Sequence, residues 1–353
     1  MRALLIVNPH ATSTTSGRRD LIVRALKSAV DLEVVLTRYR GDATKLAATA
    51  AAERFGLVIT LGGDGTVNEA VNGLLGSSNP LTHDGRGQEP DHAPPDADEL
   101  PALAALPGGN ANVFIRSLAL PDDPVDAAAR LIDDLAHGRE RRIGLGRADG
   151  RYFTFNAGLG LDAEVVRAVD GMRAHGRTLT PALFARTALR QYYRVTDRHR
   201  PAITITEPAG LSPADVFLCI VSNSAPWTYL GRRPVYANRD ASFDTGLDLL
   251  GFLSLGTVAT LRALRQMLAD RTEPPRGRAL VTAHDLPALV LRADRPVAFQ
   301  LDGEYMGEVE DVSLHSVPGA LRVVGLAAPI AAKSSHPGAA AEAGHGAPCQ
   351  ACD

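Results

Sequence analysis

The chain of 353 residues is longer than one hydrophobic core usually supports, so its length favours two domains. Apolar residues make up 45% of the sequence and charged residues 22%, which is typical of a globular protein and excludes a disordered or fibrous one. The net charge of −3 lacks the basic excess of a nucleic-acid-binding protein, three cysteines are too few for a disulfide framework, and no apolar run reaches the roughly 18 residues that cross a bilayer.

Residues 1–142 alternate short apolar runs with amphipathic stretches. Strands are expected at residues 4–7, 32–37, 57–61 and 103–106. Helices are expected at residues 18–30, 42–54, 67–75 and 111–118, and again after Pro124. Continuous apolar strands between helices indicate a parallel sheet that is covered on both faces, with right-handed crossovers. Residues 77–99 are polar and rich in Gly and Pro, so we predict a mobile surface insertion there.

Beyond residue 142 the pattern changes to strand-like runs separated by turn residues, which indicates a mostly antiparallel sheet. The expected strands are 152–155, 203–206, 216–222, 249–253, 289–292 and 297–301, with helical insertions near 162–175, 180–195 and 257–270. We therefore predict an α/β + β fold. A doubly wound parallel-sheet domain over 1–142 precedes a β-sandwich domain over 143–326, whose last strands are candidates for packing back on the first domain. Residues 327–353 are predicted to be a disordered tail.

A glycine-rich turn at residues 62–66 joins the strand expected at 57–61 to the next helix. Glycines allow backbone amides to approach a phosphate, and a helix amino terminus adds N–H groups and partial positive charge. Thr66 and Glu69 have the spacing of a capping box, which predicts where the helix starts. Asp64 would repel a phosphate unless it pairs with a metal or exchanges a proton, so its position indicates a function. An ordinary capped glycine turn is the alternative.

A second glycine turn, at residues 107–110, follows the next strand, and Asn110 is placed to cap the following helix. A polar loop at residues 8–17 follows the first strand. In a doubly wound sheet, loops at the carboxyl ends of the strands meet at one edge, where ligands bind. These loops therefore predict a phosphate-binding site at that edge, although helix-capping loop chemistry is the alternative for residues 8–17.

Five motifs occur in a fixed order along the chain, at residues 8–9, 62–66, 107–112, 156–162 and 302–304. This order resembles the diacylglycerol kinase catalytic family, which includes bacterial diacylglycerol kinases, related bacterial lipid kinases, and sphingosine and ceramide kinases. The motif at 62–66 is shared with NAD kinases and 6-phosphofructokinases, whereas the full set is more specific. The resemblance extends from residue 2 to residue 325. It implies an ATP-binding amino-terminal domain, a lipid-binding carboxyl-terminal domain and catalysis between them.

The resemblance also implies which residues surround ATP and Mg²⁺. Those assigned to ATP are Asn8, Pro9, Thr37, Gly62, Gly63, Asp64, Gly65, Thr66, Asn68, Glu69, Gly108, Gly109, Asn110 and Asn112. Asn110 stands where relatives often have Thr or Ser, and Val113 stands where many have Asp. Residues 241–248 resemble the family's metal-binding segment, although Thr245 interrupts the pattern. Asp244 is assigned to Mg²⁺, which prefers hard oxygen ligands.

Asp302, Gly303 and Glu304 follow the strand expected at 297–301, and a glycine between two acids fits a tight turn that presents both carboxylates near one point. Phosphoryl transfer to a hydroxyl group needs a proton acceptor. Resemblance to the bacterial kinases assigns this role to Glu304 of this chain, whereas resemblance to the sphingosine-kinase branch assigns it to Asp64. We favour Glu304, with Asp302 and Asp64 as the other catalytic candidates. A plain hairpin turn is the alternative.

The segment 167–200 contains eight arginines and two acidic residues, in a chain whose total charge is −3. Its expected helix also carries apolar and aromatic residues. Arginines attract anionic lipid headgroups by about 1 kcal/mol each, and apolar side chains can enter the boundary of the acyl chains. Arg186, Arg190 and Arg194 are therefore predicted to bind an anionic membrane surface. A solvated basic helix that packs one face on its own domain is the alternative.

Together with the other patterns, the resemblance implies a cytoplasmic lipid kinase that uses ATP and Mg²⁺ and associates peripherally with the inner face of the membrane. Diacylglycerol is the favoured lipid acceptor. No signal peptide is expected, because the apolar run at the amino terminus is short and leads into a turn. An NAD kinase-like enzyme and a catalytically inactive nucleotide or lipid sensor are the alternatives. Nucleic acid is not an expected partner, and the sequence leaves a homodimer open.

Overall fold

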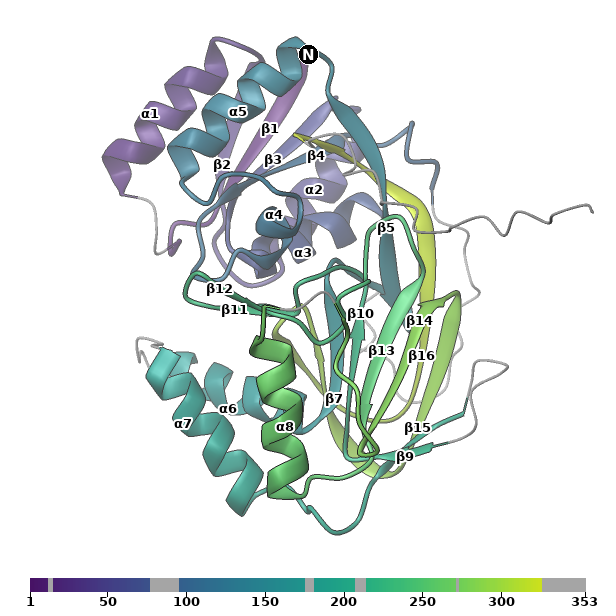
Figure 1. Ribbon diagram of the computed structural model, residues 1–353. Coiled ribbons are helices and arrows are strands. Elements are labelled where there is room, and N and C mark those ends of the chain that lie inside the picture. The colour runs from purple at the N-terminus through teal and green to yellow at the C-terminus, as the bar shows by residue number, and fades with distance from the viewer. Residues whose placement is uncertain (12–14, 77–94, 175–180, 207–213, 271–272, 326–353) are drawn as a thin grey trace, which may run out of the picture.

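The computed structural model describes residues 1–11, 15–76, 95–174, 181–206, 214–270 and 273–325 (Figure 1). The insertion predicted at 77–99 lies outside the described residues except for 95–99, and the tail predicted at 327–353 lies outside them entirely. The elements of the amino-terminal half are β1 Arg2–Val7, α1 Ser16–Lys27, β2 Asp31–Leu36, α2 Asp42–Ala52, β3 Leu57–Gly62, α3 Asp64–Leu74, β4 Ala102–Pro107, α4 Val113–Ser117 and α5 Pro124–Ala136.

The carboxyl-terminal half is mostly built from strands, with three described helices inserted between them. Its helices are α6 Leu161–Ala174, α7 Pro181–Arg194 and α8 Thr257–Leu268. Its strands are β5 Glu140–Ala148, β6 Arg151–Phe153, β7 Asn156–Gly160, β8 Ile203–Ile205, β9 Ala214–Val216, β10 Leu218–Ser222, β11 Thr228–Leu230, β12 Arg233–Val235, β13 Leu247–Phe252, β14 Leu280–Leu286, β15 Ala288–Leu301 and β16 Glu304–Val324.

The strands β2, β1, β3 and β4 lie side by side and are all parallel. Strands β3 and β4 are buried at every residue, because helices cover both faces of this sheet. Helices α1 and α5 pack on one face through Ile22, Leu26 and Leu131. Helices α2, α3 and α4 pack on the other face through Ala47, Val71 and other apolar side chains. The doubly wound parallel sheet predicted from the apolar runs is confirmed.

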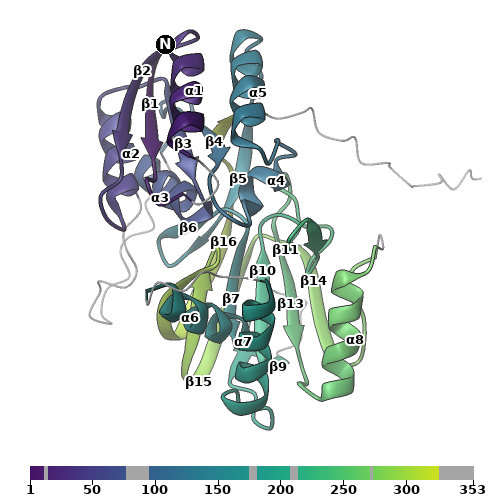
Figure 2. The same ribbon diagram turned by 90° about the vertical axis from the view of Figure 1, so that its left-hand side faces the viewer.

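The second half continues the same sheet with antiparallel strands, in the order β14-β13-β10-β7-β15-β16 (Figure 2). One core lies among these strands, and a second core lies between them and the helices α7 and α8. The α/β + β fold class predicted from the sequence is therefore confirmed. None of the helices in the described ranges is both long and apolar enough to span a bilayer.

Strand β16 connects the two halves within one sheet. It starts at Glu304 as the partner of β15, and near its other end Val323 pairs in parallel with Leu103 of β4. Strand β5 follows it in antiparallel register, from Leu314 opposite Ala148 onwards. As a result, Leu321 and Val323 are buried in the core of the amino-terminal half. The chain therefore returns to its first half only after it has built the second.

Candidate active site

Two glycine bends lie against each other at the carboxyl ends of β3 and β4. The amide of Gly108 donates a hydrogen bond to the carbonyl oxygen of Gly62 over 2.8 Å. A Cβ atom built on Gly109 would lie 2.8 Å from the Cα of Gly63, closer than Cβ atoms come to other backbones. The glycines are therefore required by the contact between the two bends, whether or not a phosphate also binds there.

The loops after β1 and β2 reach the same edge of the sheet. The amide of Asn8 donates to the carbonyl oxygen of Leu61 over 2.9 Å, and its side-chain Nδ2 donates to Thr66 Oγ1 over 3.4 Å. The amide of Thr37 donates to the carbonyl oxygen of Val7 over 2.9 Å. Residues predicted to surround ATP thus converge from four strand ends. Their contacts with a nucleotide stay a prediction.

Helix α3 begins at Asp64, three residues before the start predicted at residue 67, so the capping box was a wrong prediction. The N-cap is Gly63, which has no side chain to accept a hydrogen bond. The Glu69 carboxylate instead accepts hydrogen bonds from the amides of Gly41 (2.7 Å) and Ala43 (3.2 Å) at the start of α2. Glu69 therefore satisfies the amino terminus of a neighbouring helix and fastens α2 to α3.

The carboxylate of Asp64 points at helix α4. Its Oδ1 accepts a hydrogen bond from the amide of Phe114 over 3.0 Å, in the first turn of that helix. Burial raises the pKa of Asp64 to about 6, although hydrogen bonds from the amides of Phe114 and Val113 lower it. The acid that follows the first glycine bend thus has a structural partner of its own. With a pKa near 6, it can also change its protonation state close to neutral pH.

The N-cap of α4 is Asn112, and the prediction that Asn110 caps this helix was wrong. Asn112 adopts a positive φ of 46°, which Asn tolerates better than most residues. Its Oδ1 accepts a hydrogen bond from the amide of Gly109 (2.9 Å), and its Nδ2 donates to the carbonyl oxygen of Gly109 (3.0 Å). The bend continues for two residues past Asn110, through Ala111 and Asn112, before the helix starts. Asn112 therefore closes the bend, while Asn110 is exposed.

Asp302 and Gly303 form the two-residue turn between β15 and β16, with φ angles of 49° and 75°. Positive φ at both positions is typical of a type I′ hairpin turn. The buried carboxylate of Asp302 accepts five hydrogen bonds, and burial raises its pKa while the hydrogen bonds lower it. The donors are Asn68 Nδ2, Thr154 N, Thr154 Oγ1, Phe155 N and Asn156 N. Because its oxygens are fully used, Asp302 is suited to hold the turn rather than to accept a proton.

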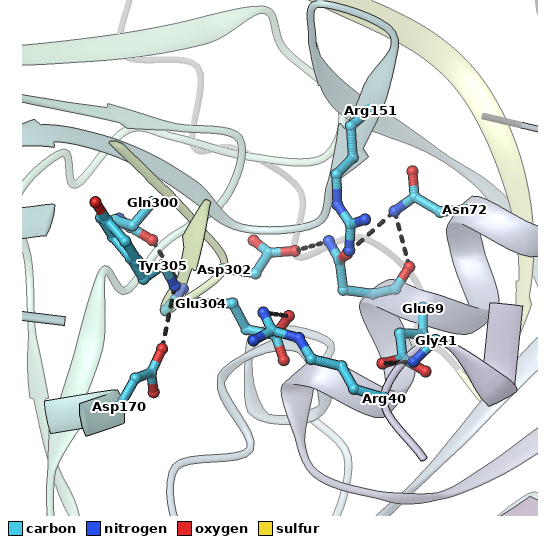
Figure 3. Close-up of polar contacts among 12 residues, drawn as sticks. Arg40, Gly41, Glu69, Asn72, Arg151, Asp170, Gln300, Asp302, Glu304 and Tyr305 are labelled. Atoms are coloured by element: carbon cyan, nitrogen blue, oxygen red, sulfur yellow. Dashed lines mark hydrogen bonds and ion pairs between the residues drawn. The ribbon is translucent and has the colours of Figure 1, made fainter. Parts of the chain in front are cut away.

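Glu304 follows this turn and lies against the amino terminus of α3. Figure 3 shows its carboxylate beside Arg40. A methyl group on Gly65 would overlap Glu304 Oε1, so the carboxylate is in direct contact with the glycine motif. Its Oε2 forms an ion pair with Arg40 Nη2 over 3.1 Å. The side chain of Glu304 is 23% exposed, so a substrate can reach it. The acidic turn of one half and the glycine bend of the other therefore meet.

Arg151 is a further charged residue of this site, and the sequence motifs did not indicate it. Its partly buried guanidinium donates to Asn68 Oδ1 over 2.7 Å, while Asn68 Nδ2 donates to Asp302 Oδ2 over 2.8 Å. Burial lowers the pKa of Arg151, and the nearby carboxylates of Glu304, Asp302 and Glu69 raise it. Through Asn68, strand β6 is thus linked to both α3 and the acidic turn.

Asp244, predicted to bind Mg²⁺, forms an ion pair with Arg141 Nη2 over 2.6 Å. One of its two carboxylate oxygens, Oδ1, is therefore already paired with a cation. Asp248, at the end of the same segment, accepts hydrogen bonds from His284 and from the amide of Asp285. Across the described ranges, His, Cys, Asp and Glu residues form no cluster of three or more that could hold a metal ion. Mg²⁺ binding by Asp244 stays a prediction.

The substitution Gly65→Ala should separate activity from stability. The new methyl group should displace the Glu304 carboxylate, and a misplacement of about 1 Å can lower turnover by roughly a hundredfold. The temperature of thermal unfolding should be unchanged or slightly higher, because alanine is about 1 kcal/mol more favourable than glycine inside a helix. Gly171→Ala in α6 is the matched control, since a Cβ there meets nothing within 4 Å. Full turnover in Gly65→Ala would show that the position of Glu304 does not matter.

Comparison with known proteins agrees with this geometry. A family profile described as the diacylglycerol kinase catalytic domain matches residues 2–148. The chain is also 34% identical over 166 residues to a diacylglycerol kinase from Bacillus subtilis (strain 168), covering 45% of this chain and 46% of that protein. A diacylglycerol kinase from Staphylococcus saprophyticus is 30% identical over 154 residues, covering 43% of each chain.

The matched part of the chain spans less than half the length of these curated diacylglycerol kinases. The fold likeness extends further than the sequence likeness. A crystal structure of a diacylglycerol kinase from Bacillus anthracis str. Sterne superimposes with a TM-score of 0.65 and 20% identity, over 92% of this chain and 96% of that one. The resemblance to the diacylglycerol kinase family inferred from the motif order is confirmed, and both halves of the chain share the fold of that structure.

Proposed function

We propose that this protein is an ATP-dependent lipid kinase, which transfers the γ-phosphate of ATP to a hydroxyl group of a membrane lipid. Diacylglycerol is the favoured acceptor, with phosphatidic acid as the product. The contact between Glu304 and Gly65 carries the proposal, because it puts an accessible carboxylate at the helix terminus where the glycine bends gather. The curated relatives, which are themselves diacylglycerol kinases, support a lipid as the acceptor.

The phosphates of ATP would bind at the amino terminus of α3 and along the two glycine bends. The first amides of a helix have no partner within the helix, and they carry partial positive charge. Arg40 and Arg151 supply two guanidinium groups close to Glu304, where the negative charge of the transferred phosphate would accumulate. Asn8 and Thr37 border this region at the ends of β1 and β2, and Thr66 borders it in the first turn of α3.

In the proposed reaction, the oxygen of the lipid hydroxyl forms a bond to the γ-phosphorus while the bond from that phosphorus to the β–γ bridging oxygen breaks. ADP leaves with the bridging oxygen, and Glu304 accepts the proton of the hydroxyl group. Asp302 holds the turn that carries Glu304. Asp64, with its pKa near 6, is the alternative proton acceptor. Mg²⁺ accompanies ATP in this proposal, without an assigned protein ligand.

Transfer of radioactive label from [γ-³²P]ATP tests this function. Purified protein should move the label into the organic phase when a panel of diacylglycerol, ceramide and a sphingoid base is supplied in detergent micelles, with diacylglycerol the preferred acceptor. NAD is included as a separate acceptor in the same assay. Label in NADP would favour the NAD kinase-like alternative, and no transfer to any acceptor would favour an inactive sensor.

We also propose that the protein works at the inner, anionic surface of the membrane as a peripheral protein. Its lipid acceptor resides there, and Arg186, Arg190 and Arg194 of helix α7 are all exposed. Exposed arginines near a surface of anionic lipids contribute about 1 kcal/mol each. Binding should therefore weaken as the salt concentration increases, because salt screens these charges.

A further inference from the structure

Helix α8 presents an apolar row to the solvent. Val258 is 80% exposed, Leu261 60% and Leu264 40%, at a spacing that places them on one side of the helix. The opposite side is also apolar, since Ala263 and Met267 are buried in the core beneath the helix. A surface helix of a globular protein normally has polar residues on its solvent side. The exposed apolar row of α8 therefore indicates a binding surface.

Helix α7 lies next to α8 and extends the same surface. The hydroxyl group of Tyr192, near the end of α7, donates to the carbonyl oxygen of Leu255 over 2.6 Å, just before α8 starts. On the outer side of α7, Leu189 is 59% exposed and Tyr193 50%. Both helices form the outer layer of the carboxyl-terminal half (Figures 1 and 2). Their exposed apolar side chains therefore lie on the side away from the sheet.

The two helices carry basic side chains and no acidic ones. Arg186, Arg190 and Arg194 are exposed on α7, and Arg262 and Arg265 are exposed on α8. The whole chain has a net charge of −3, so this concentration of positive charge is local. Apolar side chains flanked by arginines match the chemistry of a bilayer surface, where acyl chains lie beneath anionic headgroups.

We propose that α7 and α8 form one membrane-docking face, in which the row Val258, Leu261 and Leu264 enters the acyl boundary and the five arginines contact anionic headgroups. A second copy of the chain fits this face less well. A symmetric dimer through the same surface would bring the arginines of both copies together, and these like charges would repel each other. The proposal extends the proposed function, because it names the surface through which a lipid kinase would meet its substrate.

Co-sedimentation with vesicles tests the docking face. The full chain is mixed with vesicles of phosphatidylcholine and phosphatidylglycerol, or of phosphatidylcholine alone. The double variant Leu261→Ser/Leu264→Ser should bind the anionic vesicles about a hundredfold more weakly than the wild type, at about tenfold for each buried leucine. Leu21→Ser is the matched control, because Leu21 is 48% exposed on α1 in the other half and should bind like the wild type. The double variant should melt at the wild-type temperature, since both side chains are exposed.

Equal binding of the double variant and the wild type would overturn the proposal, as would wild-type binding that ignores the anionic lipid. Size-exclusion chromatography with light scattering tests whether a second copy of the chain occupies this face instead. If the wild type is a dimer and the double variant is a monomer, the face belongs to an interface between two copies. The kinase assay keeps this result separate from the proposed function. The double variant should lose phosphorylation of lipid in vesicles while it keeps phosphorylation in detergent micelles. If the wild type binds vesicles but phosphorylates lipid neither in vesicles nor in micelles, the result would contradict the proposed kinase activity and still support the docking face.

Discussion

Glu304→Gln should lower turnover by about two to four orders of magnitude, which is the usual contribution of a general base. The amide keeps the size of the side chain and its position against Gly65, but it cannot accept the proton of the lipid hydroxyl. ATP binding should remain within a few-fold of the wild type, because the phosphates are proposed to bind backbone amides. Single-turnover label transfer and nucleotide titration measure the two quantities separately.

Glu310→Gln on the same strand is the control, since Glu310 is exposed and should be replaceable without effect. The competing assignment is tested with Asp64→Asn, in which asparagine can still accept the hydrogen bond from the amide of Phe114. If Glu304→Gln keeps a large part of the turnover while Asp64→Asn abolishes it, Asp64 is the proton acceptor. Its pKa of about 6 should then set the acid limb of the pH–rate profile, with activity lost as the pH falls below that value.

Asp302→Asn should destabilise the protein by about 3 kcal/mol. The carboxylate accepts hydrogen bonds at both oxygens, three at Oδ2 and two at Oδ1. In either orientation, the amide NH₂ of asparagine would face at least two buried donors and leave them without an acceptor. Thermal unfolding should shift down by several degrees, and turnover should fall as well, because the same turn positions Glu304.

Asp311→Asn is the matched control for this destabilisation. Asp311 lies further along β16 and pairs with Arg292, but both side chains are about 70% exposed. An exposed ion pair contributes little to the free energy of unfolding, so the control should change it by less than about 0.5 kcal/mol. An Asp302→Asn protein that melts together with this control would mean that the five hydrogen bonds do not hold the turn.

The parallel half could be predicted well because its signal is local. Strands β3 and β4 are buried on both faces, so their sequences are continuous apolar runs, and glycines follow each of them. No strand was predicted at residues 304–324, although the last strands of the second half were candidates for packing back on the first domain. Only parts of the 21 residues of β16 are buried, and its charged and polar residues, such as Glu308 and Asp311, break the apolar pattern. Its pairing with β4 joins residues more than 200 positions apart, which periodicity cannot reveal.

The sequence predicted the motifs of the site but not the hydrogen-bond and ion-pair partners of their side chains. The glycine bends and the acidic turn are short sequence features, whereas the partners of their side chains come from other elements. The Glu69 carboxylate accepts hydrogen bonds from amides at the start of α2 instead of capping its own helix. These amides, of Gly41 and Ala43, lie beside Glu69 in space although they are 28 and 26 positions away in the sequence. Arg40 and Arg151 belong to no motif, and only the fold places these guanidinium groups beside Glu304. A cluster of charges this far apart in the chain has no local signature.

The path of β16 also determines when the first half can finish folding. Leu321 and Val323 belong to the core built mainly by residues 4–155, and Val324 packs on the far side of the same sheet. During synthesis, the amino-terminal segment therefore leaves the ribosome with an open edge at β4 and an incomplete core. It has to wait until residues 320–324 have been made. Such a delay exposes apolar surface to other chains, so we expect nascent or truncated forms that end before residue 320 to depend on chaperones.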